Sequence, residues 1–487
     1  MNKPLRRVVT AMLVMFGLLI ANTTYVQFVK ADDYRDDSAN PRVLLTEYSH
    51  PRGNILVDKK PVATSVKTKD RLEYQRTYPQ GPLYAPATGF YSLVYGGTGI
   101  ENVENDVLAG TDDRLAFSRL SDLFTGHDLK GGNVELTLNA KAQQAAYQAM
   151  AKQTGAVVAL NPKTGAILAM VSTPSYDPSV VSTHDSAEIT KNYKKLIDDP
   201  TDPMLNRALR QTYPPGSTFK TVISAAALKA GYKPSDRVPA PDAYQLPTST
   251  HLLHNFDGES CGDGKTDTLA HALEMSCNTA YAELGVKLGK QKVVDEAKEF
   301  GIDDKNFSVP LSTAGSSVGD IPDDSALAES SIGQQDVRIT PLQGAMIAAA
   351  VANHGTLMKP YLVKQIEASN FSVIDSTDPQ QLSEPMSSGD ADELTSMMEG
   401  VVQGPDGTGK SAQIPGIKVA GKTGTADNAP GKPPHAWFIG FAPADDPQVA
   451  VAVLIEHGGV AGNETTGGEA AAPIGKAVMQ AIIGDHH

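Results

Sequence analysis

A proline-proline-glycine break followed directly by an apolar helix pattern constrains this chain more than any other stretch. Residues Tyr213–Lys220 (YPPGSTFK) end the preceding element, and the run 221–228 continues as a helix pattern that stops near Gly231. Ser217 is therefore expected in the first turn of a buried helix, where unpaired backbone N–H groups and the helix dipole favour a developing negative charge. Lys220 follows three residues later, so both side chains share one helix face. A serine in contact with an amine that burial has made neutral is an activated nucleophile.

The Ser-x-x-Lys pattern carries little information alone, because a chain of this length contains it about once or twice by chance. A second triplet, Ser276–Asn278 (SCN), follows it between two helix patterns. A hydroxyl there can relay a proton, and an amide can bind a peptide through a donor and an acceptor together. Taken by itself, the same triplet is also a common helix cap.

A third motif, Lys422–Thr425 (KTGT), is expected at the end of a strand, 417–421, beside a sheet edge. Its lysine would supply positive charge for a substrate carboxylate, and its hydroxyls would bind the carboxylate oxygens. Its glycine would leave room for substrate against the strand. Taken alone, the motif could be only a polar strand end, and similar triplets occur at Lys163–Gly165 and Ser38–Asn40. The order of the three motifs on their expected elements is what makes them informative.

The N-terminus indicates a membrane anchor. Basic residues among the first seven precede an apolar stretch, 8–20, that can be extended to residue 29, and four aspartates follow. This length spans a bilayer, and the positive flank places the N-terminus in the cytoplasm. A cleaved signal peptide is the alternative, although residues 20–22 form a poor cleavage site. Both interpretations place the rest of the chain outside the cytoplasm.

The remaining pattern predicts two folded units of the α/β (α+β) class. Residues 1–30 form the cytoplasmic tip and transmembrane anchor, and residues 31–41 form a tether. Residues 42–153 form a small, β-rich, non-catalytic domain with many turns. Residues 154–487 form a larger domain with an antiparallel sheet between helix layers, because hairpin patterns outnumber crossovers.

The two cysteines, Cys261 and Cys277, indicate a disulfide, because an even pair outside the cytoplasm is usually oxidised. Nearby histidines at 251, 254 and 271 leave a zinc site conceivable, but they lack the paired spacing of a structural zinc motif. The disulfide is favoured, and no metal or cofactor is expected. The net charge of -14, without a basic stripe in the mature chain, argues against nucleic acid as a partner.

The three motifs in this order resemble the motif set of penicillin-binding proteins and class A β-lactamases. The chain is most similar to the monofunctional class B penicillin-binding proteins, which are D,D-transpeptidases, and among them to the actinobacterial PbpA group. The similarity covers nearly the whole chain. It includes the anchor, the Pro51–Ile55 segment (PRGNI) and Gly155–Val171, as well as the segments around the first and third motifs.

This resemblance implies a penicillin-binding, serine β-lactamase-like transpeptidase domain above a pedestal or dimerisation-type domain. It implies acyl transfer between peptidoglycan stem peptides through an acyl-serine, with β-lactams acylating the same serine. The implicated residues are Ser217, Lys220 and Ser276 as catalytic groups, and Asn278, Lys422, Thr423, Gly424 and Thr425 as substrate-binding groups. The backbone N–H groups of Ser217 and Thr425 would form the oxyanion hole.

In those roles, Lys220 is the base for Ser217, and Ser276 passes the proton towards the leaving D-Ala amine. A Cys261–Cys277 bridge would brace the second motif. Class B membership also implies a membrane glycosyltransferase partner of the SEDS type, because the segment before Gly132 is too short for a glycosyltransferase domain. Elongation, septation and sporulation roles all stay open.

Four other functions share parts of this pattern. A secreted β-lactamase needs a base for deacylation, and no glutamate with the family's spacing is evident after Asn278. A D,D-carboxypeptidase differs only in using water as acceptor. A β-lactam sensor would be acylated without turnover, and a scaffold would have no catalysis.

Four more residues are possible parts of the site. Gln334, Trp437 and Phe438 could line the cleft, although packing is favoured for the two aromatic residues. His435 is expected in a loop without a chemical role.

Overall fold

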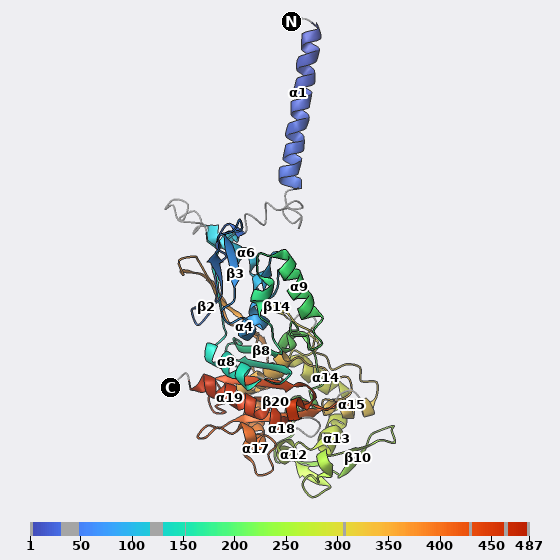
Figure 1. Cartoon of the computed structure of the whole chain (residues 1–487). Coiled ribbons are helices and arrows are strands. Elements are labelled where there is room, and N and C mark those ends of the chain that lie inside the picture. The colour runs from blue at the N-terminus through green and yellow to red at the C-terminus, as the bar shows by residue number, and fades with distance from the viewer. Residues whose placement is uncertain are drawn as a thin grey trace.

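The computed structural model describes residues 3–30, 48–116, 130–150, 152–304, 308–427, 431–461 and 466–484 (Figure 1). The predicted tether, 31–41, and the triplet Ser38–Asn40 lie outside the described residues. Helix α1 (Lys3–Thr24) continues into a π-helical turn, η1 (Tyr25–Val29). This 27-residue segment is long and apolar enough to cross a membrane, and none of it is buried in the protein. It is compatible with the expected single-pass anchor.

A five-stranded antiparallel sheet forms the centre of the larger body, in the order β19-β20-β21-β7-β8. Its strands are β7 (Gly155–Leu160), β8 (Ile167–Thr173), β19 (Ala420–Ala426), β20 (His435–Ala442) and β21 (Val449–Ile455). Along β21, odd-numbered residues pack into one core and even-numbered residues into the other. The strands are almost continuously apolar because both faces of the sheet are covered.

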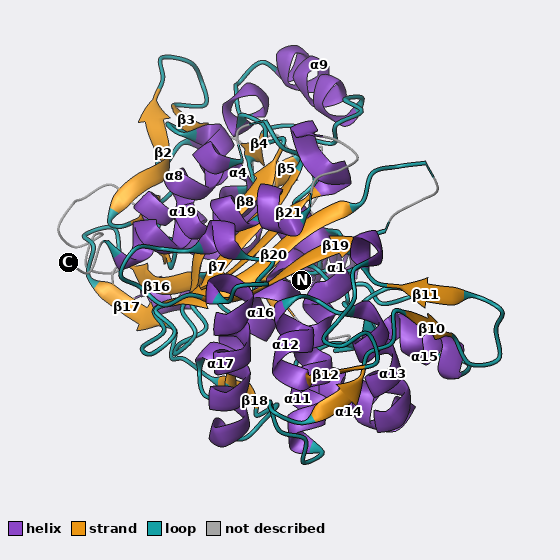
Figure 2. Cartoon of the chain, turned by 90° about the horizontal axis from the view of Figure 1, so that it is seen from below, coloured by secondary structure: helices purple, strands orange, loops and turns teal. Residues whose placement is uncertain are grey.

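Helices cover the two faces of this sheet (Figure 2). On one face lie α8 (Ala140–Ala149) and α19 (Ala472–Ile483), which also pack against each other. On the other lies α16 (Pro341–Ala352), every residue of which is buried. The prediction of an antiparallel sheet between helix layers is therefore confirmed. Asn139 caps α8, its Oδ1 accepting from Ala142 N at 2.9 Å.

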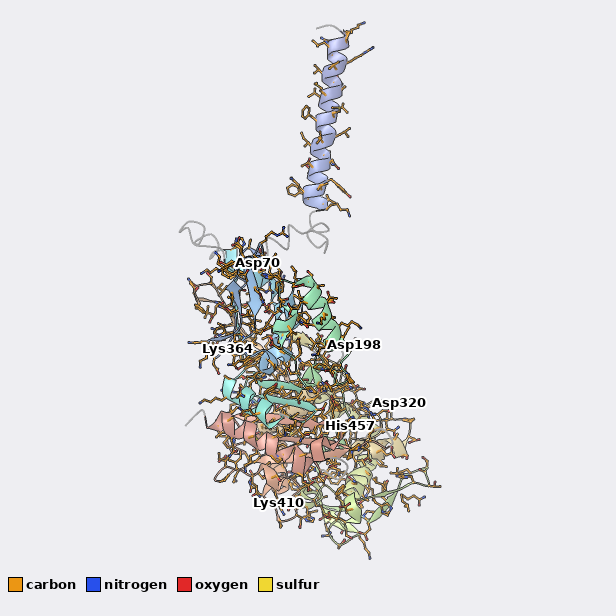
Figure 3. The ribbon with its side chains drawn as sticks, in the orientation of Figure 1. Asp70, Asp198, Asp320, Lys364, Lys410 and His457 are labelled. Atoms are coloured by element: carbon orange, nitrogen blue, oxygen red, sulfur yellow. A yellow bond between two sulfur atoms is a disulfide. The ribbon has the colours of Figure 1, made fainter. Side chains whose placement is uncertain are left out.

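A second sheet, with six strands, contains the strands of the first folded unit, in the order β17-β16-β6-β1-β2-β3. Its strands are β1 (Ile55–Val57), β2 (Lys60–Lys67), β3 (Tyr74–Thr77), β6 (Asn133–Leu136), β16 (Val363–Glu367) and β17 (Val373–Ser376). The β16–β17 hairpin comes from much later in the sequence and pairs with β6. Lys364 of this hairpin (labelled in Figure 3) donates to Glu135 Oε1 at 3.1 Å. The two units thus share a sheet, and α8 packs on the central sheet although it precedes residue 154.

The Pro51–Ile55 segment is held by a buried charge cluster. Glu101 accepts from Arg52 Nε at 2.7 Å and from Arg76 Nε at 2.5 Å. Tyr78 donates its hydroxyl to the same carboxylate at 3.1 Å. All four side chains are buried. The Glu101 carboxylate therefore faces two guanidinium groups, and Arg52 and Arg76 also donate to the carbonyls of Glu101 and Gly53.

Shorter elements complete the two units. The helices and helical turns are α4 (Gly81–Thr88), α5 (Gly99–Val103), α6 (Asn105–Ala109), η2 (Asp113–Leu115), η3 (Pro178–Val181), α9 (Ser186–Ile197), α10 (Arg207–Arg210), η4 (Gly216–Phe219), α11 (Lys220–Lys229), η5 (Phe256–Gly258), α12 (Leu269–Glu274), α13 (Asn278–Leu288), α14 (Lys290–Glu299), α15 (Asp324–Ser331), α17 (Ser388–Gln403), η6 (Lys410–Ala412), η7 (Glu456–Ala461) and α18 (Gly467–Ala470). The paired short strands are β4 (Tyr91–Ser92) with β5 (Gly96–Gly97), β9 (Arg237–Pro239) with β12 (Thr266–Thr268), β10 (Ala243–Gln245) with β11 (Leu252–His254), β13 (Ser308–Val309) with β14 (Leu311–Ser312), and β15 (Leu357–Met358) with β18 (Gln381–Ser383).

Candidate active site

The first motif begins with a tight 3-10 turn, η4, that leads into α11. Gly216 has a φ of +53° and donates its N–H to Gly333 O at 3.0 Å. Ser217 is half-buried and lines a cleft. Among the described residues its hydroxyl has no hydrogen-bond partner, so it is free to react with a group in the cleft. Lys220, the first residue of α11, is completely buried below it.

The Ser217 turn is held against the central sheet by its backbone. The indole N–H of the buried Trp437 donates to Pro214 O at 2.9 Å. A Cβ added to Gly424 would lie 2.8 Å from Pro215 O and 2.9 Å from Thr218 Cγ2. A glycine is therefore required at position 424, but the predicted reason, room for substrate, is wrong. The glycine lets the nucleophile's turn approach the strand.

Lys220 connects the first motif to the second. Its Nζ lies 2.7 Å from Ser276 O, 2.7 Å from Asn278 Oδ1 and 3.3 Å from Ser276 Oγ. Burial, and secondly the charge of Lys422, hold the pKa of the Lys220 amine well below its ordinary value. A neutral amine with a lone pair is the form that can accept a proton.

The second motif lies in a strained turn before α13. Ser276 has a φ of +64°, which is uncommon for a residue other than glycine. Asn255 fixes the start of the helix, because its Oδ1 accepts from Asn278 N at 2.9 Å and Thr279 N at 3.1 Å. The Asn255 side chain thus provides a hydrogen-bond acceptor for N–H groups at the start of α13 that have no partner within the helix.

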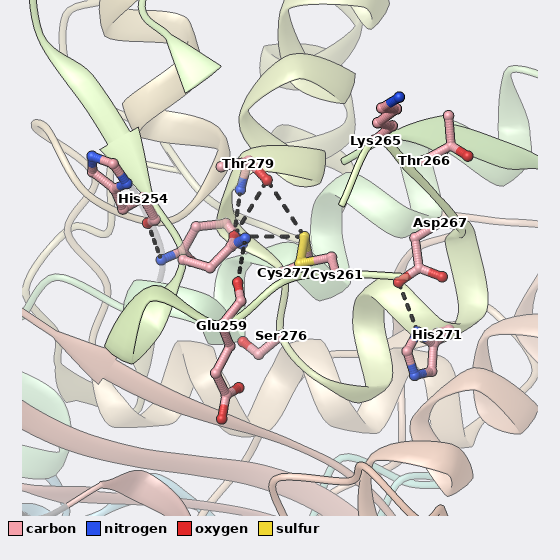
Figure 4. Close-up of a disulfide and its surroundings, with 12 residues drawn as sticks. His254, Glu259, Cys261, Lys265, Thr266, Asp267, His271, Ser276, Cys277 and Thr279 are labelled. Carbon is pink, nitrogen blue, oxygen red and sulfur yellow. Dashed lines mark hydrogen bonds and ion pairs between the residues drawn. A yellow bond between two sulfur atoms is a disulfide. The ribbon is translucent and has the colours of Figure 1, made fainter. Parts of the chain in front are cut away.

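A disulfide joins Cys261 to Cys277, with Cα atoms 6.1 Å apart (Figure 4). Both cysteines are buried, and the bridge ties the segment after Asn255 to the centre of the second motif. The cysteines are therefore not available as zinc ligands. In the described ranges no group of three or more His, Cys, Asp or Glu side chains is arranged to hold a metal ion. His251 and His254 line the cleft, whereas His271 bonds to Asp267.

The third motif lies within a strand and not, as predicted, at its end. Strand β19 pairs with β20 throughout its length, with Lys422 opposite Ile439 and Gly424 opposite Trp437. The prediction was wrong because the apolar pattern stops at Gly421, while pairing continues to Ala426. Lys422 is completely buried, and its Nζ donates to Thr423 O at 3.1 Å. Burial lowers its pKa to about 7.

The cleft between the motifs has a volume of about 740 Å³. Five predicted site residues line it: Ser217, Ser276, Asn278, Thr423 and Thr425. Three do not line it: Lys220 and Lys422 are buried, and Gly424 packs against the turn of the first motif.

The structure also places the four additional candidates. Gln334 lines the cleft. Trp437 and Phe438 are fully buried, which confirms packing for both. His435 begins strand β20 and is buried, so its placement in a loop was wrong. The run of prolines before it had suggested a loop that continued further.

Sequence reasoning missed several polar residues of the site, two of which bond directly to the motifs. Asn255 acts from more than twenty positions before the motif it supports. Thr408 lines the cleft, and its Oγ1 lies 2.6 Å from Thr423 Oγ1. Neither residue belongs to a recognisable motif, because each reaches the site only through the folded path of a loop.

Replacing Gly424 by alanine should displace the Ser217 turn. We expect Gly424→Ala to lower the free energy of unfolding by about 1–3 kcal/mol and to slow covalent labelling by a fluorescent penicillin by about a hundredfold. Thermal melting and labelling time courses measure the two effects. Gly315→Ala is the control, because no atom lies within 4 Å of a Cβ at that glycine. Equal labelling rates for both variants would contradict the packing argument.

Removing the Asn255 side chain should loosen the second motif. We expect Asn255→Ala to cost about 1 kcal/mol of stability, the usual value of a lost helix cap, and to reduce the penicillin labelling rate by more than that loss explains. Asn353→Ala is the matched control, because the Asn353 side chain also bonds to backbone, donating to Thr356 O at 3.0 Å, but does not line the cleft. A labelling defect no larger than that of the control would rule out the positioning role.

Comparisons with known proteins agree with this geometry. The family described as the penicillin-binding protein transpeptidase domain matches residues 155–480. The penicillin-binding protein A dimerisation domain matches residues 52–134. The chain is 48% identical to the peptidoglycan D,D-transpeptidase PbpA of Mycolicibacterium smegmatis and 44% identical to that of Mycobacterium tuberculosis, covering 99% of each chain in both comparisons.

The structure is similar to penicillin-binding protein A from M. tuberculosis in its ceftriaxone acyl-enzyme complex. The TM-score is 0.88 at 45% identity, covering 90% of this chain and 100% of the other. A penicillin G acyl-enzyme complex of the same protein matches with a TM-score of 0.85 at 44% identity, covering 89% and 100%. Together with the three motifs around one cleft, these matches show that the chain belongs to the penicillin-binding protein transpeptidase family.

Proposed function

We propose that this chain is a peptidoglycan D,D-transpeptidase that cross-links stem peptides through an acyl-serine on Ser217 and is inhibited by β-lactams. The observation that carries the proposal is the unbonded Ser217 hydroxyl in a cleft that Ser276 also lines, with Ser276 Oγ 3.3 Å from the buried amine of Lys220. Its relatives are named for this activity, and a similar structure holds β-lactams as acyl-enzymes.

Acylation begins when the neutral Lys220 amine takes the proton of Ser217 as Oγ attacks the penultimate D-Ala carbonyl. Negative charge then develops on the carbonyl oxygen, which the N–H groups of Ser217 and Thr425 would stabilise. When the C–N bond breaks, Ser276 passes the proton to the leaving D-Ala amine. The 3.3 Å between Lys220 Nζ and Ser276 Oγ suits this relay.

Substrate binding falls to the groups that line the cleft. Asn278 would hold the stem-peptide amide, while the hydroxyls of Thr423 and Thr425 would bind the terminal carboxylate. Lys422 lies beneath them, buried, and would contribute through its charge. In this arrangement the Lys422 charge both attracts the carboxylate and helps to keep Lys220 neutral.

A D,D-carboxypeptidase is the alternative that a specific observation supports. Glu259 and Glu329 line the same cleft, and a carboxylate beside the acyl-enzyme could activate water. The relative rates of aminolysis and hydrolysis distinguish the two reactions. A β-lactamase would show rapid loss of bound penicillin, and a sensor or scaffold would show no transfer to an amine.

The environment of the protein is also part of the proposal. The apolar α1–η1 segment would anchor the chain once in the cell membrane, with both folded units outside the cytoplasm. A SEDS-type membrane glycosyltransferase would supply the glycan strands, because neither folded unit is assigned to that chemistry. The boundaries 42–153 and 154–487 stay a prediction, with the first unit in a pedestal or dimerisation role.

The Ser217→Ala variant tests the acyl-serine directly. We expect the detergent-solubilised full chain to retain a fluorescent penicillin for hours and the variant to retain none, because the proposed ester forms on the Ser217 hydroxyl, which the variant lacks. Gel fluorescence and intact mass measure the adduct. A thioester donor with an added amine then shows whether the acyl group is transferred. Rapid loss of label, or labelling of the variant, would count against the proposal.

The two buried lysines predict a shift in the pH profile. Removing the Lys422 charge should raise the Lys220 pKa, because that charge helps to lower it. The acid limb of the acylation rate should therefore move to higher pH in Lys422→Gln. The shift should be largest below pH about 7, where Lys422 itself is protonated. The control is Lys418→Gln, which changes an exposed lysine just before the same strand and should leave the pH profile unchanged. A profile that changes only in height would contradict the coupling.

A further inference from the structure

A second polar hollow of about 620 Å³ lies directly beside the catalytic cleft. The two hollows share Gln334, Gln335 and Asp427 as lining residues. Pro214, which precedes the nucleophile's turn, also lines the second hollow. A molecule in this hollow would therefore lie next to the cleft that Ser217 lines, with the three shared residues between them. The acylation mechanism described above does not use the second hollow.

One wall of the second hollow is formed by Glu456, whose carboxylate is held by hydrogen bonds and paired with a buried arginine. Glu456 Oε1 accepts from the Tyr213 hydroxyl at 2.6 Å and from Arg207 Nε at 3.0 Å. Arg207 is itself buried and also donates to the carbonyls of Asp202 and Thr201. The charge of Glu456 is thus matched by Arg207, and it does not cancel the other charges in the hollow.

His435 presents a hydrogen-bond donor to the second hollow. The ring is buried, and its Nδ1 accepts from His457 N at 3.3 Å (His457 is labelled in Figure 3). The proton of a neutral ring therefore lies on Nε2, which has no partner within the described ranges. Burial, then the neighbouring His457, lowers the pKa of His435 to about 4, so the ring is neutral at pH 7.

Two cations line the same hollow with unused donors. Arg338 donates through one terminal nitrogen to Gln335 O at 3.0 Å and Val337 O at 2.8 Å. Its other nitrogens, and Nζ of the exposed Lys432, have no partner among the described residues. Two cations and a ring N–H fit a carboxylate. Asp427, on the wall shared with the cleft, is exposed and unpaired in the described chain, and it fits an ammonium.

We propose that the second hollow binds the acceptor strand of the cross-linking reaction through an amino-acid end, an amine with a neighbouring carboxylate. The carboxylate would bind Arg338, Lys432 and His435, and the amine would lie at Asp427, facing the acyl-serine. This assignment rests on the proposed transpeptidase function and adds to it the position and chemical class of the acceptor.

The transfer step needs no further reactant. The acceptor nitrogen attacks the ester carbonyl of the acyl-serine, a C–N bond forms, and the C–Oγ bond to Ser217 breaks. An ammonium loses two protons when it becomes an amide. One returns to Oγ through the Ser276–Lys220 relay, and the other leaves to water by way of the Asp427 carboxylate. Holding the amine in place raises its effective concentration against water, which favours cross-linking over hydrolysis.

The test measures how the acyl-enzyme divides between aminolysis and hydrolysis. The full chain in detergent is acylated by a peptidyl thioester, with D-alanine as the acceptor probe and D-alaninol as the matched amine without a carboxylate. Products are separated by mass spectrometry. In the wild type, the half-saturating concentration of D-alanine should be lower than that of D-alaninol. Both values are expressed as the concentration of neutral amine.

Lys432→Gln and Arg338→Lys should raise the half-saturating D-alanine concentration by about tenfold, the effect of one lost charge-assisted hydrogen bond. Their effect on D-alaninol should be small, a contrast that a merely structural disturbance would not produce. Lys195→Gln, an exposed lysine on α9 that lines neither hollow, is the charge-matched control. Equal effects on the two amines, or no effect on D-alanine, would overturn the assignment by placing the acceptor elsewhere, such as beside Thr423. No acyl-enzyme in any variant would instead refute the transpeptidase function itself.

Discussion

The buried amine of Lys220 is the interaction on which the rest of the site depends. Removing an ammonium from water is expensive, so a fully buried lysine without a carboxylate is held in its neutral form. The hydrogen bonds to Ser276 O and Asn278 Oδ1 give that neutral amine its partners. The same contacts fix the second motif relative to α11. One buried group therefore sets both the reactivity and the geometry of the cleft.

The central sheet makes this burial possible. Its strands are apolar on both faces, and α16 covers one face while α8 and α19 cover the other. The Ser217 turn rests on this rigid base through Trp437 and Gly424. Such packing holds reacting groups within a fraction of an ångström. The hydrophobic core thus contributes to catalysis as a support for the turn.

The sequence predicted the parts of the site that depend on local pattern. The break at Pro214–Gly216 and the pattern after it predicted a turn at Ser217 that leads into a buried helix, and the hairpin patterns predicted the antiparallel sheet. The sequence could not predict contacts that depend on the path of distant loops, such as Asn255 capping α13 or Thr408 meeting Thr423. It also misplaced the third motif at a strand end, because strand pairing with β20 continues through polar residues. Strand pairing uses backbone groups, so it can continue through polar residues without any sign in the hydrophobic pattern.

The position of β19 relates the cleft that would bind the donor peptide to the second hollow proposed for the acceptor. This strand lies at the edge of the central sheet, so among the described residues the side of its backbone away from β20 pairs with no other strand. Such sheet edges are common binding places for extended peptides. Thr423 and Thr425 project from this strand into the cleft, and Asp427 follows immediately, at the wall shared with the second hollow. A donor peptide lying along β19 would thus end beside that wall. The strand that orients the donor also leads to the place from which an acceptor amine would approach the ester, and the geometry of both steps follows from a single sheet edge.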